Sequence, residues 1–174
     1  MIQRRSPINT SRAGASLLEL ILVMIVIFTI ATVVAPRFSD FFPNLQVRKS
    51  TDRVFAWARK ARADAALTGA AYRLVIDTSA RRYWIEYEPR PLKEPGKFQE
   101  LGGTWEGEEL PLEVEFESLE GFDGKSGKKV LEFRPDGTTE DAEIVLSNDR
   151  GDRRTIRITG ATGRIAIEPE KVGP

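Results

Sequence analysis

A run of sixteen residues without a single charge, from Leu20 to Ala35, limits what this chain can fold into more than any other feature. Only Thr29 and Thr32 interrupt its apolar character. A helix that begins at Ala15 and ends at Ala35 would be roughly 30 Å long, because each residue adds about 1.5 Å, and this is about the thickness of the hydrocarbon core of a bilayer. The sequence therefore predicts a single membrane-spanning helix over residues 15–36.

The charges that flank this run predict its orientation. Arg4, Arg5 and Arg12 precede it, and no acidic residue does. Basic residues stay on the cytoplasmic side of a membrane. Everything after Arg37 should therefore lie on the opposite side.

Three ordinary explanations compete for the apolar run. A cleaved secretory signal has an apolar core of about 7 to 15 residues and a small-residue exit. This run is longer, and its candidate exit at Ala35 is followed directly by Pro36. A plain membrane anchor and a buried core helix remain open as alternatives.

None of these explanations accounts for Glu19, an ionisable residue at the start of the apolar run. A carboxylate in a membrane costs a few kcal/mol unless a positive partner is present. Cleavage between Gly14 and Ala15 would create an α-amino group one helical turn from Glu19. A neighbouring subunit could supply the same amine.

The segment Gly14-Ala15-Ser16-Leu17-Leu18-Glu19, the apolar run and Pro36-Arg37-Phe38 together resemble the signature of type IV prepilins. The resemblance implies that a prepilin peptidase removes a cytoplasmic leader, residues 1–14, by cutting after Gly14. It also implies N-methylation of Ala15 and a role for Glu19 in filament assembly. The protein would then sit in a bacterial inner membrane, with its C-terminal head in the periplasm.

Composition removes most catalytic chemistry. The chain contains neither Cys nor His, which excludes thiol nucleophiles, Cys or His zinc sites and Ser-His-Asp triads. An acid and base pair drawn from Asp123, Asp136 and Asp141 is the remaining enzymatic alternative, but aspartates in turns are common. We expect no enzymatic activity, no cofactor and no metal.

Residues 37–69 are expected to form an amphipathic stem. Pro36 predicts a kink where the helix leaves the membrane, and with Pro43 it suggests that residues 37–44 are irregular. From Leu45 to Leu67 the helical period returns, and Gly69 is a suitable C-terminal cap. The stripe expected to face a sheet consists of Val47, Thr51, Val54, Ala58, Ala61 and Ala65.

Residues 70–174 alternate as strands do, and they predict a β-rich head. A hairpin is expected from 72–77 and 83–87, followed by a long loop over 88–104 and a strand from Leu112 that is apolar on one face and acidic on the other. Four more short strands are expected at 130–133, 143–146, 155–159 and 164–167. The predicted fold class is α+β, a long hydrophobic helix packed on a small antiparallel sheet or sandwich.

The head adds a second resemblance. Five segments together resemble the minor pseudopilin H group of the type II secretion pathway: the stretch from Ala58 to Gly69, Leu131-Glu132-Phe133-Arg134-Pro135-Asp136-Gly137-Thr138, Ile144-Val145-Leu146, Ile156-Arg157-Ile158 and Gly163-Arg164-Ile165. This implies a structural subunit that assembles with other pseudopilins or pilins to support export across the outer membrane. Contact between the head, including its loop, and secreted substrates is left open.

The alternative is a type IV pilus minor pilin that binds DNA for natural transformation. Lys plus Arg and Asp plus Glu are both 26, so no global field attracts a polyanion. Ala166, Glu168 and Glu170 also follow Arg164, where a basic tract would favour phosphate binding. DNA is therefore an unlikely partner, although four arginines lie close together at Arg150, Arg153, Arg154 and Arg157.

Overall fold

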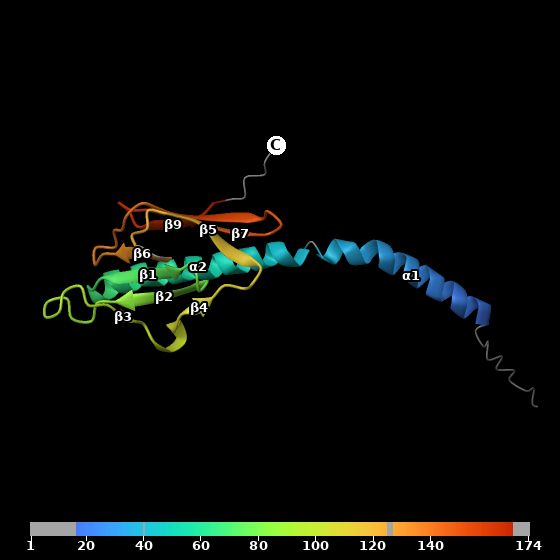
Figure 1. Cartoon of the computed structure of the whole chain (residues 1–174), viewed down its shortest axis with the longest axis horizontal. Coiled ribbons are helices and arrows are strands. Elements are labelled where there is room, and N and C mark those ends of the chain that lie inside the picture. Colours follow the sequence, from blue (N-terminus) through green and yellow to red (C-terminus); the bar gives the residue numbers. More distant parts are fainter. Residues whose placement is uncertain (1–16, 40, 125–126, 169–174) are drawn as a thin grey trace, which may run out of the picture. The chain divides into compact units, whose positions relative to one another are not determined.

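The computed structural model describes residues 17–39, 41–124 and 127–168. The chain divides into two compact units, the first ending at Asp40 and the second beginning at Phe41. The first unit contributes one helix and the second contains the head (Figure 1).

The helix of the first unit, α1, runs from Leu17 to Ser39. It continues past Pro36, and the kink expected there stays a prediction. Over the described residues, no helix combines the length and the apolarity needed to cross a membrane.

The second unit opens with α2, from Phe41 to Thr68. Residues 37–39 and 41–44 are helical, so the expectation of irregular backbone there is wrong for these residues. Pro43 is the third residue of α2. The first four N–H groups of a helix have no partner within it, so a proline in the first turn removes no helical hydrogen bond.

The predicted stripe of α2 is confirmed. All six of its residues are buried, from Val47 at 1% exposure to Ala65 at 0%. The helix ends as expected at Gly69, which has a φ of +68° and donates its N–H to the Ala65 carbonyl at 3.0 Å. A left-handed residue at this position is a common way to end a helix.

The first sheet is built on the predicted hairpin. β1 (Tyr72–Asp77) and β2 (Arg82–Tyr87) pair antiparallel, and β6 (Lys128–Phe133) pairs antiparallel with the other edge of β1. Two short strands, β3 (Gln99–Glu100) and β4 (Glu108–Glu109), add to opposite ends of β2. The 3-10 turn η1 (Gly103–Trp105) lies between them in the chain. Apart from these pieces, the expected loop over 88–104 is confirmed.

The second sheet has the order β5-β7-β8-β9, with antiparallel neighbours. Its strands are β5 (Val114–Glu120), β7 (Ala142–Asn148), β8 (Arg153–Thr159) and β9 (Arg164–Ile167). β7, β8 and β9 confirm three expected strands, and β6 confirms the fourth.

The expected strand start at Leu112 is wrong. Leu112 is 87% exposed and precedes β5. The Val114 N–H donates to the Pro111 carbonyl at 3.0 Å, so the chain turns before it enters the sheet.

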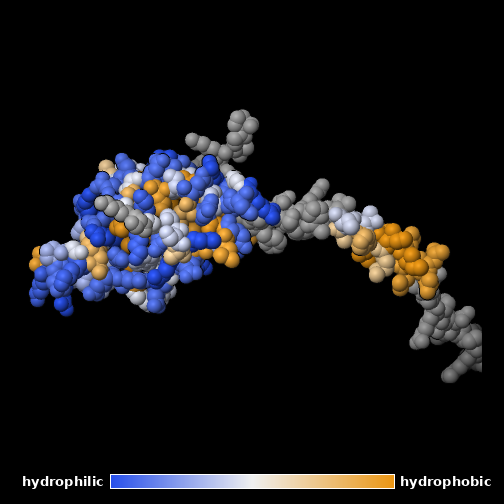
Figure 2. All heavy atoms as spheres, in the orientation of Figure 1, coloured by the Kyte–Doolittle hydropathy of each residue, from blue (hydrophilic) through white to orange (hydrophobic). Residues whose placement is uncertain are grey.

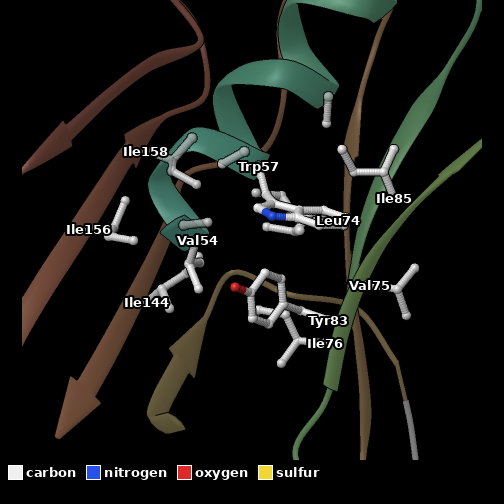
Figure 3. Packing of buried hydrophobic residues seen from close by; sticks show 14 of the residues in the cluster. Val54, Trp57, Leu74, Val75, Ile76, Tyr83, Ile85, Ile144, Ile156 and Ile158 are labelled. Atoms are coloured by element: carbon white, nitrogen blue, oxygen red, sulfur yellow. The ribbon is translucent and has the colours of Figure 1, made fainter. Parts of the chain in front are cut away.

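The core lies where α2 packs against both sheets (Figure 3). Val54 and Trp57 project from the helix toward Leu74 and Ile85 of the first sheet and toward Ile144 of the second. A helix stripe and two sheet faces therefore share one apolar cluster, and the predicted α+β class with antiparallel sheets is confirmed.

Candidate functional site

Over residues 17–32, whose side chains the structure describes, α1 is mostly apolar and exposed. Leu17 is 78% exposed and Phe28 is 72% exposed, and Figure 2 shows a mainly hydrophobic (orange) surface along this part of the helix. Soluble monomers rarely expose apolar patches of this kind. The helix therefore needs lipid or other protein segments to cover it.

The two threonines do not make this surface polar. The Thr29 hydroxyl donates to the Ile25 carbonyl at 2.8 Å, and the Thr32 hydroxyl donates to the Thr29 carbonyl at 2.9 Å. A hydroxyl bonded to the preceding turn leaves no free donor for solvent. Both threonines are thus compatible with apolar surroundings.

Glu19 lies in the first turn of α1 and is exposed. A carboxylate at this end of a helix interacts favourably with the helix dipole. Gly14 and Ala15 lie outside the described residues, so the pairing of Glu19 with the Ala15 amine stays a prediction. Pro36 is the remaining expected site residue, and it lies within α1.

In the head, Arg62 of α2 joins two turns that are distant in sequence. Its Nε donates to the Gly137 carbonyl at 3.3 Å, and its Nη2 donates to the Thr162 carbonyl at 3.0 Å. These carbonyls belong to the β6–β7 and β8–β9 connections. Arg62 and Gly137 belong to two of the five segments that carried the second resemblance, and Thr162 directly precedes a third.

Gly163 completes this arrangement. Its φ is +59°, and a Cβ at this residue would lie 2.1 Å from the Gly137 carbonyl oxygen and 2.4 Å from Arg62 Nε. Only glycine fits such a close approach without moving backbone. Packing thus explains the glycine at position 163.

Sequence reasoning did not single out Arg62. The available signal was its position, because it is a basic residue that directly follows Ala61 and so lies at the edge of the buried stripe. Such a residue needs polar partners on the same side of the helix as the core. The identity of those partners depends on turns 75 and 100 residues away, which no local pattern reveals.

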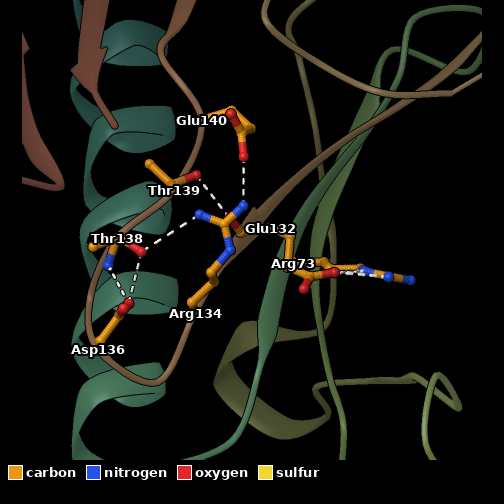
Figure 4. A network of polar contacts seen from close by, with 7 residues as sticks. All are labelled: Arg73, Glu132, Arg134, Asp136, Thr138, Thr139 and Glu140. Carbon is orange, nitrogen blue, oxygen red and sulfur yellow. Dashed lines mark hydrogen bonds and ion pairs between the residues drawn. The ribbon is translucent and has the colours of Figure 1, made fainter. Parts of the chain in front are cut away.

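Two of the candidate catalytic aspartates stabilise turns instead, and Figure 4 shows the turn at Asp136. Asp136 accepts hydrogen bonds from the Thr138 N–H at 2.9 Å and the Thr138 hydroxyl at 2.7 Å, and the bond from the hydroxyl is the largest cause that lowers its pKa. Asp141 accepts the Gly160 N–H at 2.7 Å. Asp123 lies at an isolated backbone bridge with Val130. Their contacts are those of aspartates in turns.

Two of the four arginines that suggested DNA binding lie beside carboxylates. Arg153 pairs with Glu117, and Arg157 pairs with Glu143 at 2.8 Å and also with Glu168. Capture of a polyanion relies on clustered cations that face phosphate. The described part of this surface instead alternates in sign.

Comparison with known proteins identifies the fold. No family profile and no curated protein matches the chain. Among solved structures, the chain is similar to the minor pseudopilin EpsH from the type 2 secretion system of Vibrio cholerae, at 12% identity and a TM-score of 0.57, over 71% of this chain and 96% of that one. It is also similar to the solution structure of Escherichia coli GspH, at 16% identity and a TM-score of 0.54, over 72% of this chain and 89% of that one. The chain thus has the fold of these pseudopilins.

Proposed function

We propose that this chain is a minor pseudopilin subunit of a type II secretion pseudopilus, which supports protein export across the outer membrane. One combination of features carries the proposal: an exposed apolar helix with Glu19 in its first turn, joined to a head with the EpsH and GspH fold. The role is structural, and no catalytic step is assigned to the head.

We propose that the chain is first processed in the membrane and then assembled into a filament. A prepilin peptidase removes residues 1–14 after Gly14, and the new terminus at Ala15 is methylated. Residues 15–36 reside in the inner membrane, with the head in the periplasm, until the subunit enters the filament. The uncharged run from Leu20 to Ala35 supports the membrane stage, since lipid covers such a surface at no polar cost.

Assembly then exchanges lipid contacts for contacts between helices. Packing of apolar side chains, and not exclusion of water, drives association of helices in a membrane. A carboxylate in apolar surroundings favours the position where a positive group neutralises it. Pairing of Glu19 with an Ala15 amine, its own or that of a neighbour, therefore sets the stagger between subunits.

Glu19→Ala tests this proposal. We expect the variant to be cleaved normally and to remain out of filaments, because the carboxylate is used only in assembly. Incorporation is measured as the fraction of the chain in sheared filaments, relative to the membrane fraction. Thr32→Val is the matched control in the same helix and should assemble normally. Normal incorporation of Glu19→Ala would reject the pairing.

A further inference from the structure

The head has a groove beside the first turns of α2, with a volume of about 430 Å³. This is within the size range of pockets that accept a small ligand or a few side chains. We call it the stem groove. Its wall includes Leu45, Lys49, Arg53, Tyr83, Glu108, Glu109, Leu110 and Pro111.

The polar groups at the base of the stem groove satisfy one another. The Tyr83 hydroxyl donates to Glu108 Oε2 at 3.0 Å, and Arg53 pairs with the other oxygen of the same carboxylate. Burial, followed by the nearby Glu108 charge, raises the pKa of Tyr83, so the phenol remains a neutral donor. The Tyr83 hydroxyl and the Glu108 carboxylate thus already have partners within the head.

Two charges on the rim have no such partner. Neither Lys49 nor Glu109 makes an ion pair with another described residue, and both are exposed. On the same wall, Leu45 and Pro111 provide an apolar surface, over Leu110, which is buried at 5% exposure. The stem groove thus suits a segment with an apolar side chain next to a cation and an anion.

The loop after β2 carries such a segment. Residues 90–94 form a compact turn, in which the Arg90 carbonyl accepts the N–H groups of Lys93 at 3.1 Å and Glu94 at 2.9 Å. Leu92 is 97% exposed at this turn. Lys93 makes no ion pair with another described residue, and Glu94 has only exposed partners. We call residues 90–94 the loop knob.

The groove is lined by Glu108 and Glu109 of β4, and β4 and the loop after β2 lie at opposite ends of the first sheet (Figure 1). Glu109 is paired with Arg82 at the start of β2, whereas the loop knob follows Tyr87 at its end. The strand between them is about 17 Å long at roughly 3.3 Å per residue. A knob cannot reach the groove of its own head, so the contact requires a second molecule.

We propose that the stem groove of one head receives the loop knob of a second copy of this chain. Leu92 covers Leu45 and Pro111, Lys93 approaches Glu109, and Glu94 approaches Lys49. Because the two surfaces are different, the contact is head-to-tail and can repeat along a row of subunits. It uses no residue of α1, so it is independent of the proposed pairing at Glu19.

The contact is small. A five-residue knob buries far less than the roughly 800 Å² per partner of a stable interface, so free heads in dilute solution should remain monomers. Subunits held in one membrane or filament have a much higher effective concentration, which makes a weak contact productive. Covalent trapping in the membrane is therefore the appropriate measurement.

Because the chain contains no cysteine, disulfides between copies can form only at cysteines that are introduced. In the full-length chain in its native membrane, Leu92→Cys combined with Pro111→Cys should give disulfide-linked dimers and longer ladders under mild oxidation. Each single substitution should give several-fold less. Leu92→Cys combined with Leu67→Cys is the matched control, because Leu67 is also exposed, at 84%, but lies outside the stem groove.

Charge exchange gives the second arm of the test. In the Leu92→Cys and Pro111→Cys background, Lys93→Glu alone or Glu109→Lys alone should reduce cross-linking several-fold, and the two together should restore it. The pattern should persist with Glu19→Ala, which separates this contact from filament assembly. Equal cross-linking with Leu67→Cys, no rescue by the double exchange, or disulfides to a different protein would overturn the proposal.

Discussion

At the scale of single residues, Arg62 and Gly163 show how turns that are distant in the sequence are held together. The guanidinium of Arg62 satisfies carbonyls of two turns, and Gly163 leaves the space that lets those turns approach. The bond to the Gly137 carbonyl is part-buried, and a buried carbonyl without a donor costs about 1–3 kcal/mol. Arg62 and Gly163 therefore help to fix the β6–β7 and β8–β9 connections against α2.

Gly163→Ala should lower the free energy of unfolding by about 3 kcal/mol, from strain at positive φ and from the displaced Gly137 carbonyl. Gly151→Ala is the control, since Gly151 also has a positive φ, of +87°, but nothing lies within 4 Å of an added Cβ. That change should cost about 1 kcal/mol. Urea unfolding measures both, and equal losses would contradict the packing argument.

Asp136 provides a prediction for the effect of pH. Its pKa is lowered in the folded state, so the carboxylate stabilises the fold above its ordinary value of 3.8, and this stabilisation is lost as pH falls through the lower folded value. The stability difference between wild type and Asp136→Asn should be present at about pH 6 and shrink below pH 3.8. A difference that is constant over this range would contradict the role of the charge.

At the scale of helices and strands, the sequence pattern predicted those features that depend on neighbouring residues. The α2 stripe from Val47 to Ala65 and the β1–β2 hairpin follow from periodicity and turn residues alone. The pairing of β1 with β6 did not, because it joins Tyr72 to Phe133 across most of the head. The strand start at Leu112 was misplaced because alternation continues through a turn that only the Pro111 hydrogen bond reveals.

The alanines of α2 allow the helix to approach both sheets. Ala61→Leu should destabilise the head by about 2 kcal/mol, because an added side chain has no space in a packed core. Ala66→Leu, on the exposed side of the same helix, should change the free energy of unfolding by less than about 0.5 kcal/mol. Thermal or urea unfolding of both variants decides between core packing and a general effect on helix stability.

At the scale of the whole molecule, the two units have opposite solvent requirements. The helix of the first unit exposes apolar side chains, whereas the second unit buries one core and presents charges of both signs. The sequence could predict this division because it follows from composition alone. The location of the stem groove could not be predicted, since it depends on how β4 meets α2.

The mixed charge of the second sheet predicts weak binding to nucleic acid. The purified chain in detergent should not retard double-stranded DNA in a gel, even at low salt, because Arg153 and Arg157 already face carboxylates. A basic protein of known DNA affinity serves as the positive control. Retardation that weakens steeply with salt would favour a DNA-binding pilin instead.

The mass of the N-terminal peptide of the purified protein tests the central claim most directly. The claim is that the chain matures into a subunit whose new amino end neutralises Glu19. Protein purified from its native membrane should begin at Ala15 and carry one methyl group, and it should retain residues 1–14 when the prepilin peptidase is absent. Mature protein that still begins at Met1, or that begins beyond Ala35, would contradict the account.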